Sequence, residues 1–298
     1  MNINFMRFRK IAITISLVMF VGSIGSIFMK GLSLGLDFSG GTLVEIQYED
    51  SVDLQEIRGV LSENGYEDFQ VVNFGSSLDV LIKIADQPGN SSLGDQIFAL
   101  LSSNSFEGEL KRIEFVGPQI GSELRDQGGL GMLVALGMIL LYVAFRFQYK
   151  FALGAVAALG HDVVIILGLF SIFAWVFDLS VLAALLAVIG YSLNDSIVVS
   201  DRIRENFRSE RALGSEDLIN LSLNQTLSRT VITSLTTLLV LFSLFFFGGE
   251  AVRGFSLGLI IGVLIGTYSS LYIVTTCLLY TSDAADDMQC VDLGGRRI

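Results

Sequence analysis

The stretch LSVLAALLAVIGYSLNDSIVVS, residues 179–200, decides the fold class of this chain. It is long enough to cross the hydrocarbon core of a bilayer, and its only charged residue is Asp195. A carboxylate at the centre of a membrane span costs about 2.5–3.5 kcal/mol on lenient insertion scales. A span that serves only packing has no need of that charge, so we expect Asp195 to be a functional residue.

The composition of the whole chain is typical of a membrane protein. Hydrophobic residues make up 52% of the chain and charged residues 16%, and the mean hydropathy is +0.63. Six apolar stretches predict membrane spans: residues 11–29, 128–145, 151–177, 179–200, 230–249 and a sixth from residue 254. The first lacks a cleavage pattern and is expected to remain as an anchor. One histidine and two cysteines predict neither a disulfide framework nor a metal site, and no cofactor is expected.

The positions of Lys and Arg predict the orientation of the chain in the membrane. They gather before the first span, between the second and third, and between the fourth and fifth, which predicts a cytoplasmic N-terminus. The segment 31–127 is then extracytoplasmic, and residues 30–127 hold six basic and seventeen acidic residues. The basic run from Arg202 to Arg211 predicts an interfacial helix beside anionic membrane lipids, and no nucleic-acid site.

Residues 31–127 carry the pattern of a small α+β domain. Residues 42–48 alternate as a strand does, and the apolar residues from Leu54 to Leu61 have helical spacing. Further elements are predicted in the order strand 69–74, a Gly75-Ser76-Ser77 turn, strand 80–84, helix 92–101 and strand 110–116. The predicted fold class is therefore a multi-span α-helical membrane protein with six transmembrane helices and an extracytoplasmic ferredoxin-like (βαββαβ) domain.

The segment GLDFSGGT, residues 35–42, resembles a phosphate-binding loop only in its glycine content. No Lys-Ser/Thr pair follows the glycines, and the segment leads into a strand instead of a helix N-terminus. We therefore expect a tight turn that links the first span to the first strand, without phosphate chemistry.

Four motifs together resemble the SecF subunit family of bacterial SecDF protein-export complexes, within the RND superfamily. They are GLDFSGG (35–41, with Gly35, Asp37, Gly40 and Gly41), RIEFVGP (112–118, with Gly117 and Pro118), HDV (161–163) and IGYSLNDSIVVSDRIREN (189–206). The resemblance implies a non-enzymatic component driven by the proton motive force. The partners it implies are a SecD-like subunit, the SecYEG channel, unfolded preprotein segments and membrane lipids.

The same resemblance implies roles for individual residues in the spans. Asp195 is expected in the proton path together with Arg229, at the start of the fifth span, and the alternative is a static ion pair between the two helices. His161 and Asp162, from their place inside a span, are expected to relay protons, to form interhelical hydrogen bonds or to distort the helix locally. Polar residues flanking Asp195 are expected to surround its carboxylate: Tyr191, Asn194 and Ser196.

Small residues in the last spans predict close helix packing. Gly258, Gly262 and Gly266 recur at every fourth position, and Gly128, Gly129 and Gly131 are expected to act similarly. The hydroxyl residues of the fifth span either line a hydrated path or pack, with packing favoured: Thr230, Thr233, Ser234, Thr236 and Thr237.

The motifs divide the chain into an N-terminal anchor (1–30), the α+β domain (31–127), the remaining spans (128–276) and a tail (277–298). The tail begins CLLYTSDAADD, which is similar to translated sequencing-adapter DNA, and is expected to be non-native. Two other functions stay open from the sequence. One is half of a proton-coupled exporter of small molecules, and the other is a structural assembly factor for membrane complexes.

Overall fold

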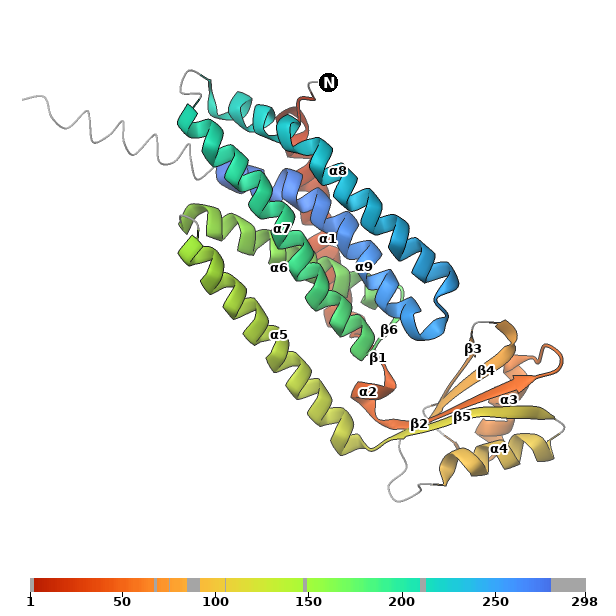
Figure 1. Cartoon of the computed structure of the whole chain (residues 1–298). Coiled ribbons are helices and arrows are strands. Elements are labelled where there is room, and N and C mark those ends of the chain that lie inside the picture. The colour runs from red at the N-terminus through yellow and green to blue at the C-terminus, as the bar shows by residue number, and fades with distance from the viewer. Residues whose placement is uncertain are drawn as a thin grey trace, which may run out of the picture.

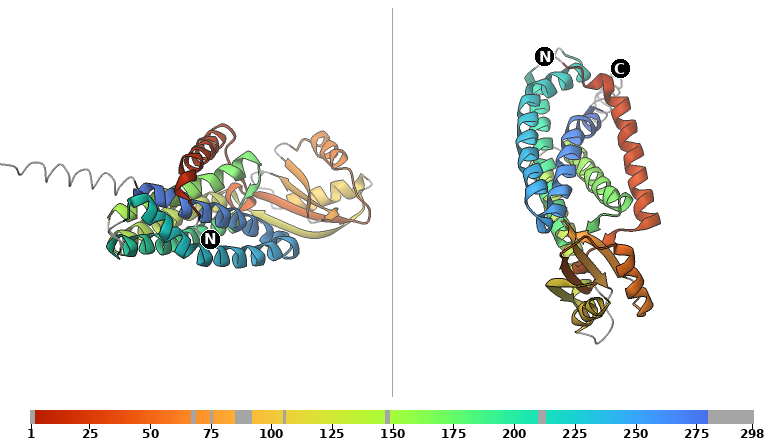
Figure 2. Two further views of the ribbon diagram at one scale, coloured as in Figure 1. Left: turned by 90° about the horizontal axis from the view of Figure 1, so that it is seen from above. Right: turned by 90° about the vertical axis from the view of Figure 1, so that its right-hand side faces the viewer.

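The computed structural model describes residues 3–66, 69–74, 76–84, 92–104, 106–146, 149–209 and 213–279. It consists of a bundle of long helices with a small α/β domain at one end, and the N-terminus lies at the other end (Figures 1 and 2). The bundle contains these helices: α1 (Arg9–Lys30), α5 (Pro118–Arg146), α6 (Tyr149–Ile172), α7 (Leu179–Ser209), α8 (Ser215–Phe247) and α9 (Glu250–Ser269). A π-helix, Ser270–Val274, continues α9.

Six of the described helices are long and apolar enough to span a membrane, which confirms the predicted number of spans. Helices α6 and α7 form the buried centre of the bundle, whereas α5 and α8 present long apolar faces to the outside. A continuous core cluster joins α6 and α7 around Phe170, Leu185 and Ile189. The outer faces of α5 and α8 therefore require lipid or a partner subunit to cover them.

The α/β domain has the predicted βαββαβ order. Its elements are β2 (Gly41–Tyr48), α3 (Leu54–Glu63), β3 (Phe69–Phe74), β4 (Ser76–Ile84), α4 (Leu93–Ser103) and β5 (Gly108–Val116). The sheet is antiparallel with strand order β3-β4-β2-β5. Alternate residues of β2 and β4, such as Val44, Ile46 and Ile82, pack under α3 and α4, which leaves the opposite sheet face free of helices.

Several predicted boundaries are wrong. The third span ends at Ile172 instead of residue 177, because the chain turns at Ala174, where φ is 52°, and enters the short strand β6 (Val176–Phe177). β6 pairs in parallel with β1 (Ser33–Leu34), and the four-residue helix α2 (Leu36–Ser39) follows β1. A two-residue strand has no periodicity, so the sequence did not reveal this pair.

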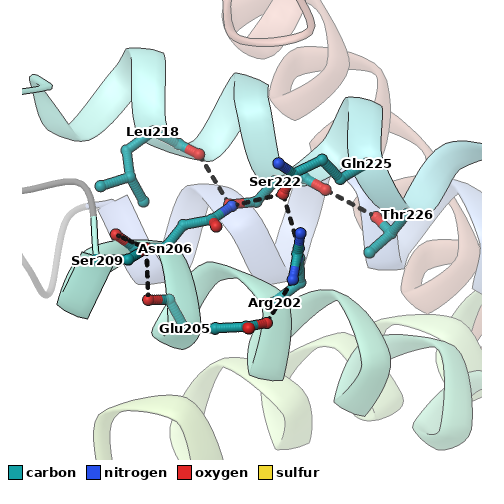
Figure 3. A network of polar contacts seen from close by, with 8 residues as sticks. All are labelled: Arg202, Glu205, Asn206, Ser209, Leu218, Ser222, Gln225 and Thr226. Carbon is teal, nitrogen blue, oxygen red and sulfur yellow. Dashed lines mark hydrogen bonds and ion pairs between the residues drawn. The ribbon is translucent and has the colours of Figure 1, made fainter.

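The predicted interfacial helix is also wrong. Residues 202–209 continue α7 as one helix, and α8 begins at Ser215, well before the predicted start of the fifth span at residue 230. Figure 3 shows the physical reason: polar residues on both helices satisfy one another, so neither helix has to end. Asn206 donates to Ser222 and to Gln225 at 2.8 Å each, and Arg202 donates to Gln225 at 2.7 Å. Glu210 and Arg211 lie outside the described residues.

Two other predictions fall partly outside the described ranges. Gly75 of the predicted turn is one such position, while Ser76 and Ser77 belong to β4. At the C-terminus, Cys277 to Leu279 continue the last helix, and Leu278 and Leu279 are buried. The rest of the predicted tail, residues 280–298, lies outside the described part of the chain.

Candidate functional site

Asp195 lies at the centre of the bundle, where three elements meet. It is buried on α7, with 8% of its surface exposed. Its Oδ1 accepts a hydrogen bond from Thr230 of α8 at 2.9 Å, and its Oδ2 accepts one from Ser270 of the π-helix at 2.8 Å. Each carboxylate oxygen therefore has a hydroxyl donor from a different element.

Arg229 lies at the depth of Asp195 but faces away from it. It precedes Thr230 directly, and Thr230 contacts Asp195, whereas the Arg229 side chain is exposed on the outside of α8. Among the salt bridges of the described residues, none joins Arg229 to Asp195. The chain alone thus does not bring the two together, and it does not form the static ion pair considered as an alternative.

Asp162 and His161 form a second buried polar site on α6. The Oδ2 of Asp162 accepts from Ser192 of α7 at 2.6 Å and from Ser269 of α9 at 2.8 Å. Its Oδ1 lies 3.0 Å from Nδ1 of His161, whose ring stacks on Phe20 of α1. Asp162 therefore makes interhelical hydrogen bonds, which were one of the expectations for this pair.

The expected polar neighbours of Asp195 behave differently from one another. Asn194 is exposed, and the Tyr191 hydroxyl donates to Ser234 on α8 at 3.2 Å, so neither side chain is bonded to the carboxylate. Ser196 is buried, and no hydrogen-bond partner for its hydroxyl lies among the described residues. Sequence reasoning missed the hydroxyls that do contact the two acids: Ser192, Ser269 and Ser270.

Thr230 was predicted to be a packing residue, and the structure gives it a direct contact with Asp195. The more exposed hydroxyls of α8, on Thr233, Thr236 and Thr237, donate to backbone carbonyls of their own helix instead. Ser234 and Thr267 of α9 share a 2.8 Å hydrogen bond between helices. Burial separates these residues: Thr230 is fully buried, whereas Thr233 and Thr236 are exposed and Thr237 is half-buried.

The glycine motif forms the joint between the α/β domain and the bundle. The N–H of Gly35 donates to Phe177 at 2.8 Å, and a Cβ at Gly35 would lie 2.7 Å from the Cβ of Asp178. Gly40 and Gly41 have φ values of 68° and 124°, which other residues rarely adopt, so the chain turns into β2 there. The motif is thus the predicted tight turn, and it is also held against the start of α7.

Asp37 strengthens the same joint. Its Oδ2 accepts the backbone N–H of Leu179, the first residue of α7, at 3.1 Å. Lys83 of β4 reaches across from the sheet and donates to the carbonyl of Leu34 at 2.9 Å. Burial lowers the pKa of Lys83, and the negative charge of Asp37 opposes that lowering. The chain leaves the α/β domain at Gly117 and Pro118, where β5 passes into α5. This passage is the second connection between the α/β domain and the bundle.

A cavity of about 870 Å³ lies beside this joint. The helix-free face of the sheet forms one wall with Leu81 and Arg112, and the ends of the membrane helices form the other with Trp175 and Phe245. Arg112 is paired with Glu45 at 3.3 Å and Glu114 at 3.1 Å. In the described part of the chain, no three His, Cys, Asp or Glu residues are grouped in a way that could hold a metal ion.

Comparisons with known proteins agree with the motifs. The family model for the C-terminal part of the protein export membrane proteins SecD and SecF matches residues 96–284, and the SecD/SecF GG-motif model matches residues 25–52. The protein translocase subunit SecF of Pseudomonas aeruginosa is 50% identical over 96% of this chain and 94% of its own length. The chain belongs to the SecF family of protein translocase subunits. SecF of Escherichia coli O157:H7 is 45% identical over 93% of this chain and 87% of its own length.

Solved structures of the family show the same architecture. The crystal structure of SecDF from Thermus thermophilus, a translocon-associated membrane protein, matches with a TM-score of 0.86 and 38% identity over 95% of this chain. A SecDF structure in the super-membrane-facing form matches with a TM-score of 0.74 and 37% identity over 98% of this chain. This chain spans 39% and 40% of those two longer chains. Membership of the SecF family supports the role in protein export and not the small-molecule exporter.

Proposed function

We propose that this chain is the SecF-type subunit of an accessory complex of the Sec translocase. In that complex it joins a SecD-like subunit and uses the proton motive force to promote preprotein translocation and release across the bacterial cytoplasmic membrane. It is a transport component and catalyses no covalent reaction. The single observation that carries the proposal is Asp195, a buried membrane carboxylate held by hydroxyls from two other elements.

A carboxylate in this position can convert proton movement into helix movement. When it is ionised, the acid only accepts hydrogen bonds, and Thr230 and Ser270 both direct their hydroxyls to it. When it is protonated, the acid also donates, so at least one of the two hydroxyls has to change its partner. One charge moved through 100 mV supplies about 2.3 kcal/mol, so sizeable mechanical work requires several protons.

In the proposed complex, Arg229 acts together with the partner subunit. Its side chain is exposed on α8, as are those of the polar residues Thr233 and Thr236. A charged residue exposed on a membrane span is costly in lipid, and the related SecDF chains are more than twice as long as this one. We therefore propose that a SecD-like subunit covers this face, and that Arg229 gates the proton path from there.

The proposed orientation places residues 31–127 outside the cytoplasm and the N-terminus inside. Movement of α7 would then reach the extracytoplasmic α/β domain through Asp37 and the glycine turn at Gly35, which contact the first turn of α7. The α/β domain, with its SecD-like counterpart, would hold and release emerging preprotein segments beside the SecYEG channel. His161 and Asp162 are proposed as a second buried polar site on the proton path.

The test is export in membrane vesicles that contain the complex with its partner. Asp195→Asn keeps the size of the side chain and removes its ability to ionise, so we expect gradient-driven export to fall to the level without a gradient. Asp201→Asn, an exposed acid on the same helix, is the matched control and should export like the parent. Export by Asp195→Asn at the parental rate, in complexes assembled to the same level, would refute the proposal.

A further inference from the structure

The two buried acids of the bundle are held by adjacent residues of one helix. Ser269 donates to Asp162 of α6 at 2.8 Å, and Ser270 donates to Asp195 of α7 at 2.8 Å. Both serines are fully buried, and they stand where α9 ends and the π-helix begins. Single π-helical turns inside α-helices are often found at functional sites. Two adjacent residues of one helix therefore form hydrogen bonds to two carboxylates that lie on different helices.

Each of these hydroxyls has one proton and a choice of two acceptors. The Oγ of Ser270 lies 2.8 Å from Asp195 and 2.9 Å from the backbone carbonyl of Thr267. While Asp195 is ionised, the charge-assisted bond to its carboxylate is the stronger of the two. When Asp195 binds a proton, its own O–H donates to Ser270, and the serine proton turns to the Thr267 carbonyl.

The change at Ser270 falls on the junction between two helix types. The backbone N–H of Ser270 is shared between the carbonyls of Gly266 and Thr267, so a stronger hydroxyl bond to Thr267 competes with the backbone bonding that closes α9. Ser269 has the same choice, with its Oγ 2.8 Å from Asp162 and 3.1 Å from the Gly266 carbonyl. A shift in the backbone of Ser270 therefore reaches the hydroxyl that holds Asp162.

Other titratable or charged groups at this level are few in the part of the chain that the structure describes: His161 and Asp162 on α6, Tyr191 on α7, whose hydroxyl donates to Ser234, Arg229 on α8, and Tyr268 and Tyr272 on α9 and the π-helix. Arg229 is exposed, and the Tyr268 hydroxyl donates to the Ala12 carbonyl of α1 at 2.6 Å. Tyr272 packs edge-on against Phe5. Asp162, with His161, is thus the buried titratable site that hydroxyl groups connect to Asp195.

We propose that Ser269 and Ser270 are positioning residues that couple the protonation of Asp195 to that of Asp162. The proposal deepens the proposed function and rests on it, because Asp195 is taken as the group that binds the proton. The serines bind no proton of their own. When one carboxylate gains or loses a proton, the hydrogen bonds of the two serines rearrange at the start of the π-helix, and this rearrangement alters the environment of the other carboxylate.

The experiment measures each acid directly instead of export. Dicyclohexylcarbodiimide labels protonated carboxyl groups in apolar surroundings, and mass spectrometry of the complex with its partner separates the peptides of Asp162 and Asp195. Ser270→Ala removes a donor to the ionised acid, so the pH of half-labelling at Asp195 should rise by about one unit, a tenfold change in protonation. Ser270→Thr, which keeps the hydroxyl, should restore the parental profile. Ser256→Ala is the matched control, because Ser256 is equally buried on α9 and donates to the Val252 carbonyl.

The coupling itself is tested with Asp195→Asn, which mimics the neutral acid. This variant should shift the half-labelling pH of Asp162, and at least half of that shift should disappear in the Ser270→Ala background. A shift of the same size in both backgrounds would mean direct repulsion between the two charges and would overturn the proposal. An absent shift would overturn it too. Neither outcome depends on export, so failure of this coupling is distinguishable from failure of the proposed function.

Discussion

At the scale of single residues, the carboxylate of Asp195 accepts one hydrogen bond from Thr230 and one from Ser270, so its protonation should depend on both hydroxyls. Thr230→Val keeps the shape of the side chain and removes the hydroxyl that donates to Oδ1 of Asp195. A hydrogen bond to a charged group is worth about 1.5–3 kcal/mol, so we expect the half-labelling pH of Asp195 to rise by about one unit. Labelling of Asp162 should change only as a consequence of the changed protonation of Asp195, because Thr230 contacts Asp195 and not the Ser269–Ser270 junction.

Thr233→Val is the matched control for this change. Thr233 lies one turn further along α8, and its hydroxyl donates only to backbone carbonyls of its own helix, those of Arg229 and Thr230. Its loss should leave the labelling of Asp195 as it is in the parent. Equal effects of the two substitutions would show that the α8 hydroxyls act through helix stability and not through contact with Asp195.

The sequence was enough to find Asp195, because a lone charge in an apolar span has a large cost and so needs a function. It was not enough to find Ser270, since serine is common in membrane helices and the burial of its hydroxyl depends on how α9 is rotated. The depth of Arg229 could be predicted from its place on α8, but its direction could not. Successive residues of a helix point about 100° apart, so Thr230 faces Asp195 and Arg229 faces outward.

At the scale of elements, glycines hold α9 against α7. A Cβ at Gly258 would lie 3.2 Å from Ala184, and one at Gly266 would lie 3.0 Å from Ser192. Gly262, between them, would clash directly with Val188. The three contacts follow one another at every fourth residue on both helices, which confirms the packing predicted from the glycine spacing. Of the other predicted glycines, a Cβ at Gly128 would lie 2.7 Å from Leu182, whereas one at Gly129 or Gly131 would meet nothing within 4 Å.

Gly262→Ala should therefore destabilise the bundle. Overpacking a close contact costs about 1–3 kcal/mol, because the two helices have to separate. Gly190→Ala is the control: it lies on α7, is exposed and has nothing within 4 Å of its added methyl group. We expect thermal unfolding of the detergent-solubilised complex at a lower temperature for Gly262→Ala, and at the parental temperature or slightly above for Gly190→Ala. Similar unfolding temperatures would mean that the contact can relax.

Elements were predictable where the sequence is periodic. The four strands of the α/β domain alternate, and their order was correct, whereas β1 and β6 are too short to show any pattern. The charged and polar residues near Arg202 suggested that the fourth span ends there. The side chains of Arg202 and Asn206 instead form hydrogen bonds to α8, and α7 continues. Pairing between helices that are adjacent in space is not visible in either sequence segment alone.

At the scale of the whole molecule, the joint decides whether the bundle and the α/β domain move together. Lys83 ties the sheet to the Leu34 carbonyl, and Asp37 ties the glycine turn to the first N–H of α7. The short β1–β6 pair adds a third link between the same two parts. These contacts lie at the end of α7, the helix that carries Asp195, so a movement of that helix reaches the α/β domain through them.

Replacing Asp37 should separate proton binding from export. Asp37→Ala leaves the N–H of Leu179 without its partner, while Asp195, far along α7, keeps its donors from α8 and the π-helix. We expect gradient-driven export to fall several-fold and the labelling profile of Asp195 to match the parent. Asp53→Ala is the control, because Asp53 accepts the Gln55 N–H at the start of α3 within the α/β domain, and its loss costs about 1 kcal/mol. Asp53→Ala should export normally. If Asp37→Ala also exports normally, movement of the bundle has to reach the α/β domain by another route. The covalent connection from β5 into α5 at Gly117 is such a route.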